Sequence, residues 1–316
     1  MINYIIWNGS PTLFSIGSLA LRWYGVLFVA GFLLCRLILL RLYKIEGKPA
    51  TDVESLAKYI FIAAIVGARF GYVLLYQPEI ILSRPFEILL PIEFQPTLHF
   101  SGLGKLSSHG AIIGILIALW IYGRKGKPGQ NYLQVLDRVS IVLALACVFI
   151  GAGNFFNAEI IGKPTNSKTG VVFTSPVTEG MVKIPCCIMR TPGGKNPLDF
   201  VTVKKDDAPT ADSAGRSPMI LYTFFTPGAN EQLVNEFLMG DVKTYLFDRS
   251  EFVYEPGTEP LHYTIFVEKD VYTARIRTKG IARHPVQLYE SICCLILFSL
   301  LYPLSVRSLL KALRSR

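Results

Sequence analysis

Charged side chains are scarce in this chain of 316 residues. Asp, Glu, Lys and Arg make up 17% of it, hydrophobic residues make up 51%, and the mean hydropathy is +0.40. Soluble domains usually contain about a quarter charged residues. The scarcity of charge excludes an ordinary soluble domain and predicts a membrane protein with a soluble portion.

Histidine and cysteine are also few, and their spacing matches no metal site. The chain has four histidines and six cysteines. Most of the cysteines lie in apolar runs, where cysteine is usually a small hydrophobic residue, whereas Cys186 and Cys187 are adjacent. We therefore expect no metal, and we expect His99 and His262 to be ordinary loop residues.

Apolar runs of membrane-spanning length recur along the chain. A bilayer requires about 20 consecutive apolar residues in a helix. The sequence predicts about five transmembrane helices, at 23–40, 59–77, 107–122, 136–159 and 285–306. Residues 1–18 lack a basic start and an Ala-x-Ala site, so we expect no cleavable signal peptide.

The basic residues indicate an orientation. The formal net charge is +9, and no nucleic-acid-binding signature accompanies it, so no nucleic acid partner is expected. Lysines and arginines collect in 41–58, in 123–128 and in the C-terminal tail, as they do in cytoplasmic loops. The rule places the N-terminus outside and the C-terminus in the cytoplasm. By span parity, 163–282 also lies outside.

The long polar segment 163–282 is predicted to be a β-rich (α+β) domain inserted between the last two helices. β-type runs occur at 219–225, 242–247 and 263–268, and 230–239 could be a short helix. The expected fold class is an α-helical polytopic membrane protein with this extracytoplasmic insert. Its expected parts are the membrane residues 1–162, the insert 163–282, and the last helix with a basic tail, 283–316.

Polar side chains gather where the predicted helices reach the outer half of the membrane. Such residues are costly there without a partner or a task. They come from all five predicted helices and comprise Tyr24, Arg69, His109, Asn154, Asn157, Glu159, Arg283, Gln287, Tyr289 and Glu290. Snorkelling explains any one of them, but together they predict a polar cavity.

These residue types suit a phospholipid headgroup, although simpler interpretations exist. Arginine forks bind phosphate, and a histidine can move a proton near neutral pH. Alternatively, His109 merely neighbours a helix N-cap, Tyr24 belongs to an aromatic belt, and Gly162 only ends a helix. Glu290 is expected to pair with Arg283 or Lys163.

Short motifs in a fixed order resemble one known family. They are Leu-Arg-Trp-Tyr-Gly at 21–25, Gly-Ala-Arg-Phe-Gly-Tyr at 67–72, Leu-Ser-Ser-His-Gly at 106–110, Gly-Asn-Phe-Phe-Asn-Ala-Glu at 153–159 with Gly-Lys-Pro-Thr at 162–165, and Arg-His-Pro-Val-Gln-Leu-Tyr-Glu at 283–290. Together they resemble bacterial prolipoprotein diacylglyceryl transferase. The family usually has arginine where this chain has Ala152, and it usually continues with two more membrane helices after the last motif helix.

The resemblance implies an enzyme of lipoprotein biosynthesis in the bacterial cytoplasmic (inner) membrane. It implies transfer of diacylglycerol from phosphatidylglycerol to the lipobox cysteine thiol in the signal peptide of a preprolipoprotein, with no metal or soluble cofactor. Catalytic roles would fall to His109, Arg283 and Tyr24. The remaining site residues would bind the substrates: Arg69, Asn154, Asn157, Glu159, Gly162, Gln287, Tyr289 and Glu290.

Two other functions are weighed beside this one. The first is a catalytically impaired homologue that binds phospholipid or lipoprotein signal segments. The second is an ion or solute transporter, which is disfavoured because no inverted repeat or charged pore pattern occurs in the sequence.

Overall fold

The computed structural model describes most of the chain and divides it into two compact units. The described residues are 4–16, 19–79, 81, 92–93, 99–100, 107–125, 127–184, 196–206, 216–268 and 271–314. The first unit comprises Met1–Val29 and Val148–Cys293, and the second comprises Ala30–Cys147 and Cys294–Arg316.

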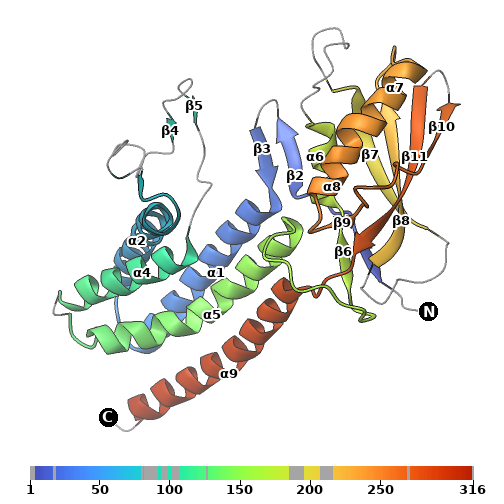
Figure 1. Cartoon of the computed structure of the whole chain (residues 1–316). Helices are drawn as coiled ribbons and strands as arrows, with labels where there is room; N and C mark the ends of the chain where they lie inside the picture. Colours follow the sequence, from blue (N-terminus) through green and yellow to red (C-terminus); the bar gives the residue numbers. More distant parts are fainter. Residues whose placement is uncertain are drawn as a thin grey trace. The chain divides into compact units, whose positions relative to one another are not determined.

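Long apolar helices account for much of the second unit (Figure 1). They are α1 (Trp23–Ile45), α2 (Ala50–Tyr76), α4 (Ser108–Gly123), α5 (Tyr132–Phe156) and α9 (Val286–Arg314), of which α1, α5 and α9 also have residues in the first unit. Four of them, α1, α2, α5 and α9, are long and apolar enough to cross a membrane, whereas α4 has only 16 residues. The chain thus has candidate membrane spans and a β-rich part, which is consistent with a polytopic membrane protein. The count of five spans stays a prediction.

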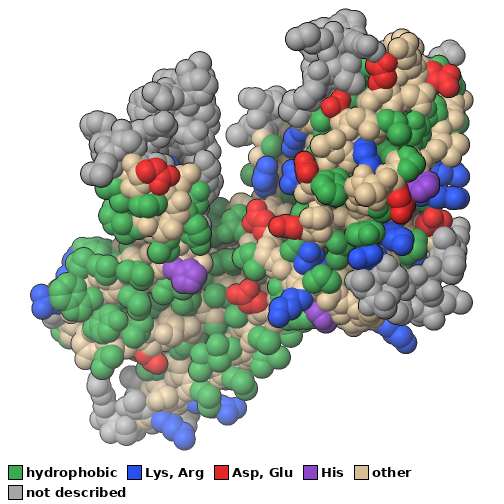
Figure 2. All heavy atoms as spheres, in the orientation of Figure 1, with side chains coloured by type: hydrophobic (Ala, Val, Ile, Leu, Met, Phe, Trp, Pro, Cys, Tyr) green, Lys and Arg blue, Asp and Glu red, His purple; other side chains and the backbone are tan. Residues whose placement is uncertain are grey.

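The helical surface is apolar where a soluble protein would be polar. Many large hydrophobic side chains are exposed on the helices, including Ile62, Leu75 and Leu300. In Figure 2 hydrophobic side chains cover the helical part, whereas charged ones are interspersed over the sheet-containing part. An exposed apolar surface of this extent fits contact with lipid.

Glycines allow α2 and α4 to pack backbone against backbone. A Cβ atom on Gly71 would lie 2.5 Å from Gly110 Cα, and one on Gly110 would lie 2.7 Å from Gly71 Cα. One turn away, a Cβ atom on Gly67 would lie 3.0 Å from Gly114 Cα, and one on Gly114 would lie 3.1 Å from Gly67 Cα. Small residues of this kind permit close helix crossings in membranes.

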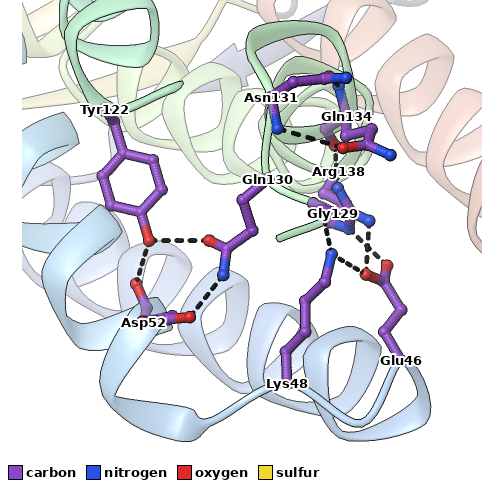
Figure 3. A network of polar contacts seen from close by, with 9 residues as sticks. All are labelled: Glu46, Lys48, Asp52, Tyr122, Gly129, Gln130, Asn131, Gln134 and Arg138. Atoms are coloured by element: carbon purple, nitrogen blue, oxygen red, sulfur yellow. Dashed lines mark hydrogen bonds and ion pairs between the residues drawn. The ribbon is translucent and has the colours of Figure 1, made fainter. Parts of the chain in front are cut away.

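A buried polar network joins the helix ends on the side of the predicted cytoplasmic loops (Figure 3). Arg138 Nη2 donates to Glu46 Oε2 at 2.5 Å, and Gln130 Nε2 donates to Asp52 Oδ2 at 2.5 Å. The Tyr122 hydroxyl lies 2.9 Å from Gln130 Oε1. The network ties the α1–α2 turn to the α4–α5 turn, and because each buried charge has a partner, the pairing offsets the cost of desolvation.

An antiparallel sheet forms the core of the first unit. Its strand order is β10 (Tyr263–Glu268), β11 (Val271–Ile281), β8 (Arg216–Phe225) and β7 (Leu198–Lys205), and β9 (Val253–Tyr254) pairs with β11. One face is covered by α7 (Glu231–Phe237), the π-helical turn η2 (Leu238–Val242) and α8 (Lys243–Asp248), as Figure 1 shows. The helix α6 (Ser175–Val182) also contributes to this core.

Short strand pairs complete the described structure. β1 (Ile5–Trp7) runs parallel to β6 (Val171–Phe173), β2 (Thr12–Ile16) pairs with β3 (Leu19–Arg22), and β4 (Ile92–Glu93) pairs with β5 (His99–Phe100). Cys186 and Cys187 lie outside the described residues.

The sequence predicted the sheet in part. The runs 219–225 and 263–268 are confirmed as parts of β8 and β10, and the short helix is confirmed as α7, capped by the Asn230 side chain. The strand predicted at 242–247 is wrong, because these residues continue the helical segment into α8. Leu238, Val242 and Leu246 recur every fourth residue and are all buried, which is a helical period.

Candidate functional site

The end of α5 carries the start of the motif at 153–159, and it makes two close contacts within the first unit. A Cβ atom on Gly151 would lie 2.8 Å from Gln287 O, and one on Gly153 would lie 2.8 Å from Tyr24 Cδ2. The two glycines therefore let α5 approach both α9 and the first turn of α1. Tyr24, predicted as a site residue, consequently lies against the Asn154 motif.

The turn after α5 has an unusual backbone. Ala158 and Ile160 both have a φ of 52°, a value that a β-branched residue rarely adopts. The turn is held by the Asn157 N–H donating to Gly153 O and the Glu159 N–H donating to Asn154 O, each at 3.0 Å. Backbone strain of this kind persists only where the surroundings enforce it, and it clusters at functional sites.

Two buried amide oxygens in this region have no hydrogen-bond partner among the described residues. They are Asn157 Oδ1 and Gln287 Oε1. The amide nitrogens fix how both groups point, because Asn157 Nδ2 donates to Glu159 Oε1 at 3.5 Å and Gln287 Nε2 donates to Glu159 O at 2.6 Å. A buried acceptor without a donor is rare and marks a place where a ligand can donate.

Arg283 joins three separate segments of the first unit. Its Nη1 donates to Gly162 O at 2.9 Å and its Nε donates to Glu251 O at 2.7 Å, while its backbone pairs with Val171. Gly162 is confined in turn, since a Cβ atom there would lie 2.5 Å from His284 O. Burial lowers the pKa of the Arg283 guanidinium from its ordinary value, and the nearby Glu251 carboxylate opposes the shift.

The first turns of α9 carry the last predicted residues. The Tyr289 hydroxyl lies 3.2 Å from His284 Nδ1, and Tyr289 is 40% exposed. Glu290 is exposed, and no ion pair joins it to Arg283 or Lys163 in the described part of the chain. The predicted pairing of Glu290 is therefore wrong: Glu290 is exposed, and the Arg283 guanidinium donates instead to the carbonyl oxygens of Gly162 and Glu251.

Arg69 and His109 lie in the second unit. Ser107 is the N-cap of α4, since its Oγ accepts from the Gly110 N–H at 3.4 Å, and His109 is therefore a neighbour of a helix N-cap, as the alternative interpretation stated. His109 is exposed in the first turn of α4, and Arg69 is half-buried on α2. Near them a groove of about 560 Å³ runs between α2 and α4, lined mainly by apolar side chains.

Sequence reasoning missed Trp7. Its ring contacts the rings of Phe155 and Phe156 at centroid distances of 4.7 and 5.5 Å, and its Nε1 is buried without a partner among the described residues. Only its position as an aromatic residue in a polar stretch could have indicated it. The parallel pairing of β1 with β6, which is not local in sequence, brings it to the motif.

No group of three or more histidine, cysteine, aspartate or glutamate side chains with the geometry of a metal site occurs among the residues that the structure describes. The cysteines there, Cys35, Cys147, Cys293 and Cys294, all lie in helices and form no disulfide with one another.

The sequence model of the prolipoprotein diacylglyceryl transferase family matches residues 11–314. The chain belongs to this family. Among curated proteins named phosphatidylglycerol–prolipoprotein diacylglyceryl transferase, the one from Tolumonas auensis is 42% identical over 169 residues, covering 54% of this chain and 61% of the relative. The Chloroherpeton thalassium protein is 37% identical over 54% of this chain and 60% of its own length, and the Bacteroides fragilis protein is 34% identical over 54% and 61%. The chain thus spans about 60% of the length of these members of the diacylglyceryl transferase family.

Proposed function

We propose that this chain is a phosphatidylglycerol–prolipoprotein diacylglyceryl transferase. In the proposed reaction the lipobox cysteine thiolate attacks the diacylglyceryl carbon that carries the phosphate in phosphatidylglycerol. A C–S bond forms, and the bond between that carbon and the phosphate oxygen breaks. Glycerol phosphate leaves and the thiol proton passes to a base. The observation that carries the proposal is the match to the family over 11–314, which includes all the motifs.

The proposed phosphate ligand is Arg283. A guanidinium has five N–H groups in a planar fork that suits phosphate oxygens. Two of them donate to Gly162 O and Glu251 O, and no described residue accepts from the other three. The side chain is therefore held in place by backbone carbonyls and can still donate to a phosphate oxygen.

The unpaired amide oxygens support a headgroup rich in hydroxyl groups. Asn157 Oδ1 and Gln287 Oε1 are buried acceptors, and the glycerol of phosphatidylglycerol carries hydroxyl donors. Asn154, Glu159 and Tyr24 would orient the lipid or its partner residues. Gly162 would keep the backbone close to Arg283, and Tyr289 and Glu290 would border the substrate.

Two residues of the second unit complete the proposal. His109, exposed in the first turn of α4, is assigned as the base that takes the thiol proton, since the thiolate is the nucleophile. Arg69 would bind the lipid near the apolar groove of about 560 Å³, which suits an acyl chain.

The proposal includes an orientation in the bacterial inner membrane. The N-terminus and 163–282 lie outside, where preprolipoproteins present their signal peptides, and the C-terminus is cytoplasmic. Residues 1–162 and 283–316 form the membrane part, and 163–282 form the insert. The basic short loops support this orientation.

A second candidate function rests on Ala152. The family usually has arginine there, and Ala152 lies between the two glycines by which α5 contacts α9 and α1. A homologue without that arginine could bind phospholipid or a lipoprotein signal segment without transferring diacylglycerol.

Transfer to a peptide separates the two functions. The full chain in phosphatidylcholine nanodiscs would receive phosphatidylglycerol labelled in its acyl chains and a lipobox peptide. Mass spectrometry should detect a diacylglyceryl thioether on the peptide, and none on a control peptide with serine for cysteine. Lipid binding without any thioether, in wild type and in Ala152→Arg, would replace the enzyme by the lipid-binding homologue.

A further inference from the structure

The face of the sheet that α7 and α8 leave uncovered carries a row of cations on β11. Arg275, Arg277 and Lys279 are exposed at alternate positions, whereas Ala274 and Ile276 between them are buried in the core. Residues two apart on a strand point to the same face about 7 Å from each other. The two-residue period of the strand therefore brings all three cations to the same face.

At one end of this row the surface is hollowed. A pocket of about 310 Å³, here called the β10–β11 pocket, is lined by Leu261, His262, Tyr263, Thr264, Arg275 and Arg277. The register pairs Thr264 with Arg275, and the Arg277 N–H donates to His262 O at 2.9 Å. Strand pairing thus brings a hydroxyl, an imidazole and two guanidinium groups to one concavity.

Two aromatic rings on the neighbouring strands contact the Arg275 guanidinium. The guanidinium lies 5.3 Å from the centroid of the Tyr222 ring and 5.9 Å from that of Phe266. Cation–π contact restrains the guanidinium while the N–H groups at its edge stay able to donate. The Arg275 side chain therefore loses less conformational entropy when an anion binds.

Carboxylates do not neutralise this pair of arginines. Within the ranges that the structure describes, no acidic side chain forms an ion pair with Arg275, and Arg277 has only Asp206, at 3.9 Å with 68% of the arginine side chain exposed. The Asp206 side chain is 15% exposed, but an ion pair of that length with a largely exposed guanidinium contributes little. Glu268 stands on the same face, at the far end of β10.

We propose that the β10–β11 pocket binds the phosphate group of a phosphate ester. Two guanidinium forks, the Thr264 hydroxyl and the His262 ring offer donors from several directions, which suits the tetrahedral oxygens of a phosphate better than a flat carboxylate. The ester can be a lipid headgroup of a membrane surface or a soluble phosphate ester. The site is separate from the Arg283 cluster, and it does not rest on the proposed transfer reaction.

Binding of two phosphate probes tests the proposal without any transfer assay. The full chain in phosphatidylcholine nanodiscs would be titrated with glycerol phosphate by calorimetry. In a second arm, flotation would measure its binding to phosphatidylglycerol vesicles against phosphatidylcholine vesicles. Saturable binding to the soluble probe alone identifies a soluble ester, and binding to the anionic vesicles alone identifies a headgroup.

Variants on one strand give the matched comparison. Arg275→Gln should weaken binding of the effective probe about tenfold or more, because it removes a charged donor. Arg275→Lys should also weaken it, since the fork is lost at equal charge. Lys279→Gln removes the same charge from the same strand face outside the pocket and should change the binding constant by less than about twofold.

Two results would overturn the proposal. One is that neither probe binds the wild-type chain saturably. The other is that Lys279→Gln weakens binding as much as Arg275→Gln does, which would mean diffuse attraction to a basic face. Amide hydrogen exchange in β8 and β11 would verify that all three variants keep the sheet intact.

Discussion

Arg283 links three segments of the first unit and is also the proposed phosphate ligand. Its two hydrogen bonds to the carbonyl oxygens of Gly162 and Glu251 depend on the geometry of a guanidinium. A lysine keeps the charge but cannot donate in both directions from one planar group.

We predict that Arg283→Lys weakens phosphatidylglycerol binding by about tenfold and that Arg283→Ala weakens it further, because hydrogen bonds to charged groups contribute about 1.5–3 kcal/mol. Binding would be measured with the full chain in phosphatidylcholine nanodiscs. Arg249→Lys, at an exposed position after α8, is the control and should bind normally. Normal binding by Arg283→Ala would end the role of Arg283 as a phosphate ligand.

His109 is exposed and is not needed as the cap of α4, because Ser107 has that role. We predict that His109→Ala lowers transfer by about 10² to 10⁴ with unchanged membrane insertion, which is the usual contribution of a general base. Ser108→Ala, the exposed neighbour, should keep its activity. Transfer at the wild-type rate in His109→Ala would mean that another group is the base.

Asp241 lies in η2 with a buried Oδ2 that has no partner among the described residues, and burial raises the pKa of its carboxyl group. The native state therefore binds this proton more tightly than the unfolded state. Its contribution to stability is complete at acidic pH and declines as pH rises through the raised pKa. At neutral pH the half-buried carboxylate carries a desolvation cost, and its Oδ2 has no hydrogen bond in the described part of the chain.

We predict that Asp241→Ala raises the free energy of unfolding at neutral pH by about 1 kcal/mol and has a smaller effect at acidic pH. Thermal unfolding in detergent at several pH values would measure this. Asp248→Ala, at an exposed position in α8, should lack the pH-dependent gain. An equal gain for Asp241→Ala at all pH values would contradict the argument.

At the scale of elements, the crossing of α2 and α4 depends on glycine. A Cβ atom on Gly110 would lie 2.7 Å from Gly71 Cα, and backbone atoms cannot move aside as a flexible side chain would. An added methyl group must therefore push the two helices apart or shift the point at which they cross.

We predict that Gly110→Ala destabilises the protein by about 1–3 kcal/mol, the usual cost of overpacking, although alanine favours helix. Gly25→Ala is the matched control in α1, since nothing lies within 4 Å of its added Cβ. Unfolding midpoints in detergent would be compared. Equal midpoints for Gly110→Ala and wild type would show that the crossing tolerates separation.

At the scale of the whole molecule, the orientation of the chain in the membrane can be tested. The basic short loops predict that Lys125 is cytoplasmic and that Lys204, on β7, is outside; both side chains are exposed. Single cysteines at these two positions, in a chain whose own cysteines are replaced, would be labelled in intact spheroplasts with a membrane-impermeant reagent. We expect labelling at 204 and protection at 125. The reverse pattern would invert the orientation.

The sequence determined the helical part and the family. Helices at 23–40 and 107–122 were predicted close to the bounds of α1 and α4, because an apolar run forms a helix through hydrogen bonds within the run itself. The start of α2 was missed by nine residues, since the predicted helix began at 59 and α2 begins at Ala50. Its polar first turns carry no hydropathy signal. The motifs that indicate the family are visible in the sequence itself and do not depend on knowledge of the fold.

Only the tertiary structure decided how distant residues meet. The sequence predicted Arg283 as a site residue, but its bonds to Gly162 and Glu251 depend on segments more than 30 residues away along the chain. Strand pairing likewise decides where β7 and β11 lie, how Trp7 reaches the motif, and how the Arg277 backbone meets that of His262. Pairing partners are selected by the burial of a whole face at once, and no local pattern of residues encodes that choice.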